Sequence, residues 1–121
     1  MPQAASAEAA AREGIAELTP AELKARLDRG DRLCIVDVRE PHEWDIVNLE
    51  RYGARLLPLG RLPERMHELD SAEEIVLHCR SGGRSAKAYR QLQAAGFRRL
   101  WNLKGGVIGW VDEVEPTLPR Y

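Results

Sequence analysis

Residues 79–85 read Cys-Arg-Ser-Gly-Gly-Arg-Ser and carry the side chains best suited to chemistry in this chain. Gly82 and Gly83 permit backbone angles closed to other residues, so successive N–H groups can converge on one point. A helix beginning near Ser85 would add the partial positive charge of its first turn. With two arginines beside them, these groups favour the thiolate form of Cys79 over the thiol. We therefore predict that Cys79 is a nucleophile.

The rest of this loop is expected to hold an anion on the sulfur, and this interpretation requires Cys79 to be open to solvent. The expected binding residues are Arg80, Ser81, Gly82, Gly83, Arg84 and Ser85. A cysteine at the end of a strand can also be a small buried hydrophobic residue. We favour the reactive interpretation because apolar packing does not explain two arginines, two glycines and two serines in succession. Cys34 lies among apolar residues and is expected to be structural.

Basic residues are concentrated around the same loop. Residues 79–104 contain seven basic residues and no acidic one, whereas the other parts of the chain contain 11 basic and 19 acidic residues. A basic surface there would attract an anionic substrate or an acidic protein partner. The alternative, that several of these side chains only solvate the outer face of a helix, carries equal weight.

The elements that must position the loop follow from apolar patterns and caps. Residues 19–22, Thr-Pro-Ala-Glu, form a capping box that starts a helix, and Gly30 is placed to end it. Short apolar runs predict strands at 33–36, 56–57, 74–78 and 100–102, and helical spacing predicts helices at 41–44, 61–69, 85–95 and 106–114. Strands that alternate with helices predict an α/β fold, with a small parallel sheet of about five strands and helices on both faces.

Composition limits the class of protein. The 121 residues are 44% hydrophobic and 31% charged with a net charge of -1, which indicates one globular domain and argues against nucleic-acid binding. No apolar stretch approaches the ~18–20 residues that cross a bilayer, so we expect no membrane association. Two cysteines cannot form a disulfide framework, and the setting is expected to be cytoplasmic. We expect a flexible arm at 1–14 and the domain at 15–121.

Three motifs in order and register carry a family resemblance. They are residues 37–44 (Asp-Val-Arg-Glu-Pro-His-Glu-Trp), the 79–85 loop, and residues 102–110 (Asn-Leu-Lys-Gly-Gly-Val-Ile-Gly-Trp). Together they resemble a single-domain rhodanese. The closest likeness is to the rhodanese domain at the C-terminus of adenylyltransferase–sulfurtransferase proteins, which activate small ubiquitin-like sulfur carriers. The chain would then be a free-standing relative or a fragment of a larger protein.

The resemblance implies a sulfurtransferase. Cys79 would take a sulfur atom from thiosulfate or a persulfide donor and pass it to a thiophilic acceptor, without a metal or cofactor. Asp37 would brace the loop, and Arg39 would pair with a neighbouring carboxylate. The implied partners are a small anionic donor and an acidic sulfur-carrier protein. His78 is expected to pack on the face of the sheet opposite Cys79.

The sequence departs from the family pattern at residues 48–54, Asn-Leu-Glu-Arg-Tyr-Gly-Ala, which leaves the role of that segment open. Two rival functions also stay open. One is a phosphatase on the same scaffold, which the four residues between Cys79 and Arg84 disfavour because phosphate needs a larger loop. The other is a redox-sensing or docking module whose cysteine is modified without turnover.

Overall fold

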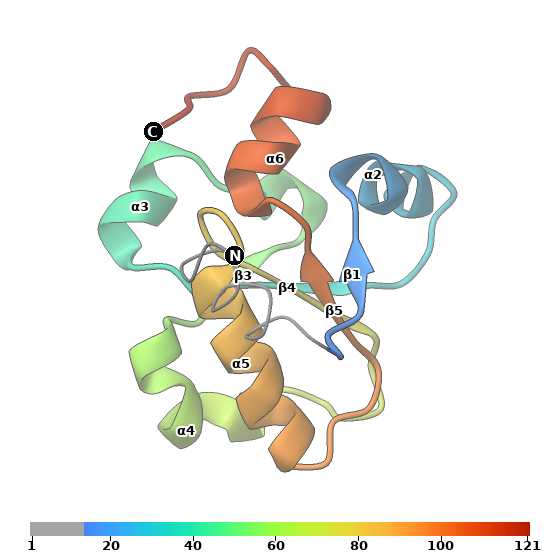
Figure 1. Ribbon diagram of the computed structural model, residues 1–121, viewed down its shortest axis with the longest axis vertical. Helices are drawn as coiled ribbons and strands as arrows, with labels where there is room; N and C mark the ends of the chain where they lie inside the picture. Colours follow the sequence, from blue (N-terminus) through green and yellow to red (C-terminus); the bar gives the residue numbers. More distant parts are fainter. Residues whose placement is uncertain (1–13) are drawn as a thin grey trace, which may run out of the picture.

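The computed structural model describes residues 14–121, so the expected arm at 1–14 lies outside the described residues except for Gly14. One sheet of five parallel strands runs in the order β1-β5-β4-β2-β3, with helices on both faces (Figure 1). The strands are β1 (Glu17–Leu18), β2 (Cys34–Asp37), β3 (Arg55–Leu56), β4 (Ile75–His78) and β5 (Leu100–Leu103). The predicted α/β class and parallel sheet are confirmed.

The helices largely follow the predicted caps. They are α2 (Pro20–Asp28), α3 (Pro41–Ile46), α4 (Leu62–Arg65), α5 (Gly83–Ala94) and α6 (Gly106–Glu113), with short 3-10 turns at Glu50–Tyr52, Leu59–Arg61 and Met66–Glu68. At the start of α2 the Thr19 hydroxyl accepts from the Glu22 N–H at 3.1 Å, and the Glu22 carboxylate accepts from the Thr19 N–H at 2.8 Å. This is the predicted capping box.

Two predicted elements need correction. The helix expected at 61–69 is only the four-residue α4, flanked by 3-10 turns. Pro63 has no N–H and fits only the first turn of a helix, so the helix cannot begin earlier, and Arg65 leaves the α region with φ −113°. The two-residue strand β1 was not predicted, because a pair of residues is too short to show a period.

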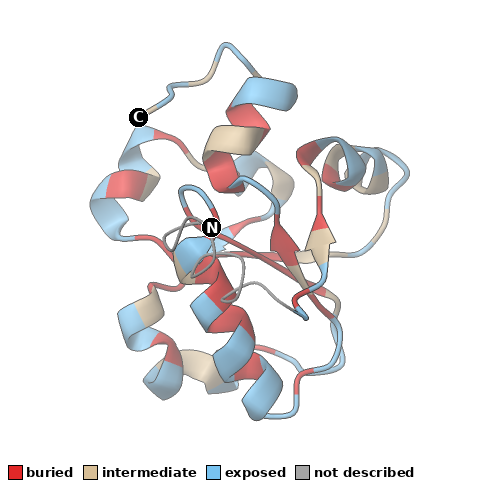
Figure 2. Ribbon diagram, in the orientation of Figure 1, coloured by how far each residue is buried: buried red, intermediate tan, exposed pale blue. Residues whose placement is uncertain are grey.

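The sheet separates two apolar cores, as the buried strands and half-exposed helices of Figure 2 show. On β4, Ile75 and Leu77 join the core under α4 and α5, while Val76 joins the core under α2 and α6. This alternation is the two-residue period of a strand with both faces covered. Cys79 continues the alternation and belongs to the α5 side. Its side chain therefore points inward rather than to solvent.

The loops that follow β2 and β4 leave the sheet toward opposite faces. The chain after β2 enters α3, and Val47, the residue after that helix, packs with the α6 residues Val107 and Val111, while the chain after β4 enters α5 on the other side. In open parallel sheets, ligands bind outside the carboxyl ends of strands whose connections diverge in this way. Asp37 ends β2 and is in register with His78, so Cys79 lies at this edge of the sheet.

The turn between β5 and α6 supports the Cys79 loop from beneath. The Val107 N–H donates to the Cys79 carbonyl at 2.9 Å, and the Ile108 N–H donates to the Arg80 carbonyl at 3.1 Å. Gly106 makes this approach possible: its φ is +61°, and a Cβ there would lie 2.7 Å from the Cys79 carbonyl oxygen and closer still to that of Arg80. No other residue type fits without moving the loop.

We therefore expect Gly106→Ala to lower the free energy of unfolding by roughly 2–5 kcal/mol, measured by urea denaturation. About 1–2 kcal/mol comes from the left-handed backbone and about 1–3 kcal/mol from the clash. Gly60→Ala is the matched control, since nothing lies within 4 Å of its Cβ position and its φ is not positive. Equal stability of the two variants would contradict this account of the turn.

Candidate active site

The sulfur of Cys79 lies at the start of the loop that joins β4 to α5. Sγ accepts a hydrogen bond from the Gly82 N–H at 3.0 Å, and the Ser85 hydroxyl oxygen lies 3.4 Å from it. Gly82 has φ +118°, in the left-handed region that favours glycine. Since α5 begins at Gly83, its N-terminus adds partial positive charge beside Sγ. The loop thus places a backbone N–H donor against the sulfur, as predicted for its glycines.

The expectation that Cys79 is open to solvent is not met in this conformation. Only 1% of the residue is exposed. The physical reason is the strand alternation described above, which directs the side chain into the α5-side core. A reagent reaches the sulfur only after part of the surrounding structure moves.

Asn102 completes the polar contacts of the loop and was missed as a site residue. The Ser85 hydroxyl donates to Asn102 Oδ1 at 2.6 Å, and Asn102 Nδ2 donates to the Gly82 carbonyl at 3.3 Å. A hydroxyl has one proton to give, so this bond leaves a lone pair of Ser85 Oγ for the thiol. The side chain is fully buried at the end of β5. The sequence signal was its place in the 102–110 motif, where no role was assigned to it.

Arg39 is fully buried, and all five of its side-chain N–H groups have acceptors. Nε and Nη2 donate to the Asp37 carboxylate at 2.9 and 2.7 Å. The remaining acceptors are the carbonyl of Val47 at 2.6 Å, the carbonyl of Glu43 at 3.3 Å and the hydroxyl of Tyr121 at 2.7 Å. Arg39 pairs with a neighbouring carboxylate as predicted, and it also ties α3 and the C-terminal residues to the end of β2.

Asp37 braces the loop differently from the prediction. Its carboxylate takes hydrogen bonds from Arg39, not from the 79–85 loop. The connection continues through side chains: Tyr121 accepts from Arg39 and donates to Glu43 at 2.9 Å. Glu43 in turn binds the loop residue Arg84. Asp37 therefore reaches the loop indirectly.

Glu43 is a second site residue that the sequence analysis missed. Its carboxylate accepts from both terminal nitrogens of Arg84, at 2.7 and 2.8 Å, from the Tyr121 hydroxyl, and from the Glu40 N–H at 2.9 Å. The Arg84 hydrogen bonds, opposed by burial, lower the pKa of Glu43 to about 2. The signal was its position three residues into a helix, where a glutamate reaches back to the N-terminus; the partnership with Arg84 is a tertiary contact.

Both loop arginines are occupied in this conformation. Arg84 forms the bidentate pair with Glu43, and its side chain is 35% exposed. Arg80 donates through Nε to the backbone oxygen of Tyr121 at 2.8 Å and also through Nη2, and it lies 5.0 Å over the Tyr121 ring. Ser81 is exposed at the tip of the loop and makes no hydrogen bond with the sulfur. A donor anion would have to share or replace these contacts.

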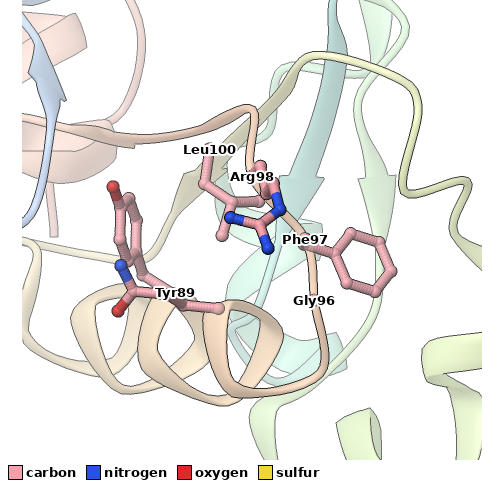
Figure 3. A pocket seen from close by; sticks show the side chains of 6 residues that line it. Tyr89, Gly96, Phe97, Arg98 and Leu100 are labelled. Atoms are coloured by element: carbon pink, nitrogen blue, oxygen red, sulfur yellow. The ribbon is translucent and has the colours of Figure 1, made fainter.

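The basic stretch 79–104 does not form one surface. Arg98 and Arg99 lie just before β5, at the amino edge of the sheet, away from Cys79. Arg98 lines a pocket with Tyr89 and Phe97, together with Gln93, Gly96 and Leu100 (Figure 3). Because parallel strands begin at that edge, this pocket lies at the end of the sheet opposite Cys79 and has no part in the chemistry of the sulfur.

His78 packs in the interior, as predicted. It is fully buried, and its Nδ1 lies 3.2 Å from the Cys79 carbonyl oxygen, which requires the proton on Nδ1. Nε2 has no hydrogen-bond partner among the described residues and lies 3.7 Å from the Asp37 carboxylate. Burial lowers the pKa of His78 and favours the neutral ring.

The divergent 48–54 segment packs on α6 rather than on the Cys79 loop. The ring of Tyr52 meets that of Trp110 edge-on at 5.1 Å. Its hydroxyl donates to Glu115 at 2.8 Å, and Arg51 pairs with the same carboxylate at 3.0 Å. The segment therefore anchors the start of the C-terminal residues.

Within residues 14–121, no helix is long and apolar enough to span a membrane. The same residues contain no group of three or more His, Cys, Asp or Glu side chains that could hold a metal ion.

The rhodanese-like domain model matches residues 19–113, which is most of the chain. The chain belongs to the rhodanese family. This rhodanese is 35% identical to a sulfurtransferase of Allochromatium vinosum over 84% of the chain and 94% of that protein. A crystal structure of a rhodanese-like domain protein from Staphylococcus aureus superposes with a TM-score of 0.75, 31% identity, and coverage of 83% of this chain and 95% of that one.

A larger relative matches over only part of its length. MoeZ of Mycobacterium tuberculosis, named as an adenylyltransferase/sulfurtransferase, is 38% identical over 86% of this chain. The chain spans about a quarter of that protein, 26% of its length. The match confirms the predicted likeness to the rhodanese part of such proteins.

We expect the Glu43 contacts to make this rhodanese sensitive to acid. A pKa lowered from 4.5 to about 2 means that the stabilisation is complete above pH 4.5 and is lost as the pH falls toward 2. Allowing for the exposure of Arg84, the loss is roughly 1–3 kcal/mol. Glu43→Gln should remove this part of the pH dependence and be less stable at pH 7, measured by urea unfolding between pH 7 and pH 3.

Glu64→Gln is the control for that comparison. Glu64 pairs with Arg61 at the surface, with side chains 60% and 62% exposed, so its loss should change stability by less than about 0.5 kcal/mol. If Glu43→Gln and Glu64→Gln had the same unfolding profile against pH, Glu43 would not be the connecting residue described here.

Proposed function

We propose that this rhodanese is a sulfurtransferase that carries a sulfur atom as a persulfide on Cys79. The observation that carries the proposal is the 3.0 Å hydrogen bond from the Gly82 N–H to Sγ, in a loop that opens directly into α5. A donor N–H and a helix N-terminus both stabilise negative charge on sulfur. The sulfurtransferase of Allochromatium vinosum, which matches nearly end to end, supports the same activity.

The proposed reaction has two steps. The Cys79 thiolate attacks the outer sulfur of thiosulfate, so that a new S–S bond forms while the S–S bond of thiosulfate breaks. Sulfite leaves with the bonding electron pair, and the protein holds a persulfide. A thiophilic acceptor then attacks the outer sulfur. Cyanide as acceptor gives thiocyanate and regenerates the thiolate, so sulfur, charge and electrons balance without a metal or cofactor.

Each loop residue has a proposed role in these steps. The Gly82 N–H would stabilise the inner sulfur, Sγ, with the Ser85 hydroxyl oxygen beside it. The other N–H groups of the loop and of the first turn of α5 would stabilise the outer sulfur of the persulfide. Arg80 and Arg84 would attract the anionic donor once their present contacts are shared. Ser81, at the exposed tip, would contact the donor or acceptor. Asp37 and Arg39 would fix the position of the loop from beneath.

The acceptor is proposed to be a thiol or an acidic sulfur-carrier protein. The proposal rests on the match to MoeZ, and on a relative in Bacillus subtilis, YrkF, whose name describes a sulfur carrier protein and which is 33% identical over 84% of this chain. Lys87 and Lys104 are exposed on elements next to the loop and would contact an acidic surface.

Intact-mass spectrometry after incubation with thiosulfate tests the proposal. Wild type should gain the mass of one sulfur atom and lose it on addition of cyanide, whereas Cys79→Ser should gain nothing. Cys34→Ser is the matched control and should behave as wild type, because Cys34 lies at the start of β2, away from the loop. If Cys79→Ser gained the mass of one sulfur atom and Cys34→Ser did not, Cys34 would be the reactive cysteine and the proposal would be wrong.

Turnover separates the enzyme from the sensing module that the sequence left open. With thiosulfate and cyanide in excess, an enzyme releases thiocyanate at a steady rate over many cycles. A sensor would be modified once and stop, so a single equivalent of thiocyanate would refute the catalytic proposal.

A further inference from the structure

Tyr121 lies against Arg80, the loop residue that follows Cys79. The residues after α6 cross to the side of α3 (Figure 1), where the Tyr121 hydroxyl donates to Glu43 at 2.9 Å. Its ring lies 5.0 Å from the Arg80 guanidinium and 5.6 Å from that of Arg39. The sequence analysis gave this residue no role.

The contact between Tyr121 and Arg80 has the form of an anion complex. Nε and Nη2 of Arg80 both donate to a single atom, the backbone oxygen of Tyr121. A guanidinium presents the same pair of N–H groups to an oxygen of a sulfonate or carboxylate. No Asp or Glu side chain pairs with Arg80 within residues 14–121, so the tyrosine holds the position that a donor oxyanion would take.

Access to the buried sulfur requires a movement, and the Tyr121–Arg80 contact costs less to open than the fully buried contacts of the site. Both hydrogen bonds of Arg80 are exposed to water. By contrast, the contacts of Arg39 with Asp37 and of Ser85 with Asn102 are fully buried. Breaking a buried polar contact leaves groups unsatisfied, whereas water replaces an exposed one.

From these contacts we infer that Tyr121 is a specificity-determining residue of the proposed sulfur transfer: it is an internal competitor for Arg80 that a donor must displace. The donor class is a small oxyanion able to accept both Arg80 N–H groups. Neutral reagents cannot take over that contact and meet a closed site. The identity of the donor in this inference rests on the proposed function, whereas the contact between Arg80 and Tyr121 does not depend on it.

The competition has a measurable consequence. When only a fraction of molecules has the tyrosine displaced, the apparent dissociation constant of an anion is the intrinsic constant divided by that fraction, and so is higher. Tyr121→Ala keeps the backbone oxygen that Arg80 binds, but it removes the hydroxyl contacts with Arg39 and Glu43 and the ring beside Arg80, which hold that oxygen in place. The variant should therefore have a lower apparent constant and a rate at saturation that is little changed. The expected pattern is therefore a lower KM for thiosulfate with a similar kcat.

A measurement that needs no sulfur transfer uses alkylation of Cys79 by iodoacetamide, followed by peptide mass spectrometry so that Cys34 does not interfere. We expect Tyr121→Ala to react at least about fivefold faster than wild type. Sulfate, at constant ionic strength, should protect Cys79 at a concentration at least about fivefold lower in the variant. Tyr121→Phe keeps the ring and loses the hydroxyl contacts, and should lie between the two.

Arg120→Ala is the matched control in the same segment. Arg120 pairs with Asp112 at the surface and does not contact the loop, so the variant should be alkylated and protected as wild type is. Thermal unfolding of each variant identifies a general loss of stability. The inference is overturned if Arg120→Ala is also alkylated fast at Cys79. It is likewise overturned if the alkylation rates of the variants rise simply as their melting temperatures fall.

The outcomes separate the inference from the proposed function. Unchanged alkylation and unchanged sulfate protection in Tyr121→Ala refute the inference, whether or not thiosulfate is turned over. Faster alkylation with unchanged sulfate protection also refutes it, because the tyrosine would then cover the sulfur without competing for Arg80. If both change as expected but no protein forms a persulfide, the competitor role stands and the proposed function fails.

Discussion

The arrangement of the site depends on the hydrogen bonds of one buried positive charge, the guanidinium of Arg39. Arg39 is fully buried, and an unpaired guanidinium there would cost several kcal/mol, on the order of the stability of a whole domain. Each of its N–H groups therefore needs a partner, and the partners come from β2, α3 and Tyr121. The need to satisfy one charge holds the end of β2, α3 and the distant Tyr121 together.

The same network adds a contact over the loop, whereas the strand alternation of β4 buries Cys79 itself. Tyr121 accepts an N–H from Arg39, donates to Glu43 and lies against Arg80, so the residue that completes the partners of the buried charge also contacts the loop next to Cys79. The contacts of Tyr121 therefore stabilise the fold and, by the same arrangement, restrict access to the loop. A sulfur held away from water is protected from oxidation. Under the proposed competition, a donor anion that replaces Tyr121 on Arg80 gains entry. The closed thiol is in this view the resting form of a rhodanese rather than evidence against its chemistry.

The sequence was informative where signals are local. The capping box of α2, the apolar runs of β2 and β4, and the glycine-rich loop each depend on neighbours in the chain, and each lies where predicted. The burial of Cys79 followed from the two-residue alternation of β4, although the expectation of an open thiol ignored it. Glu43, Asn102 and Tyr121 could not be assigned from one sequence, because their partners lie 17 to 82 residues away and only the fold brings them together.

Replacing Arg39 by lysine tests the central claim most directly. Lysine keeps the charge but offers three N–H groups from a single point, so it cannot satisfy β2, α3 and Tyr121 together. The account predicts that Arg39→Lys lowers the free energy of unfolding by about 3 kcal/mol or more and, in conditions where the protein stays folded, exposes Cys79 to iodoacetamide. A variant with stability within about 0.5 kcal/mol of wild type and an equally protected Cys79 would contradict it.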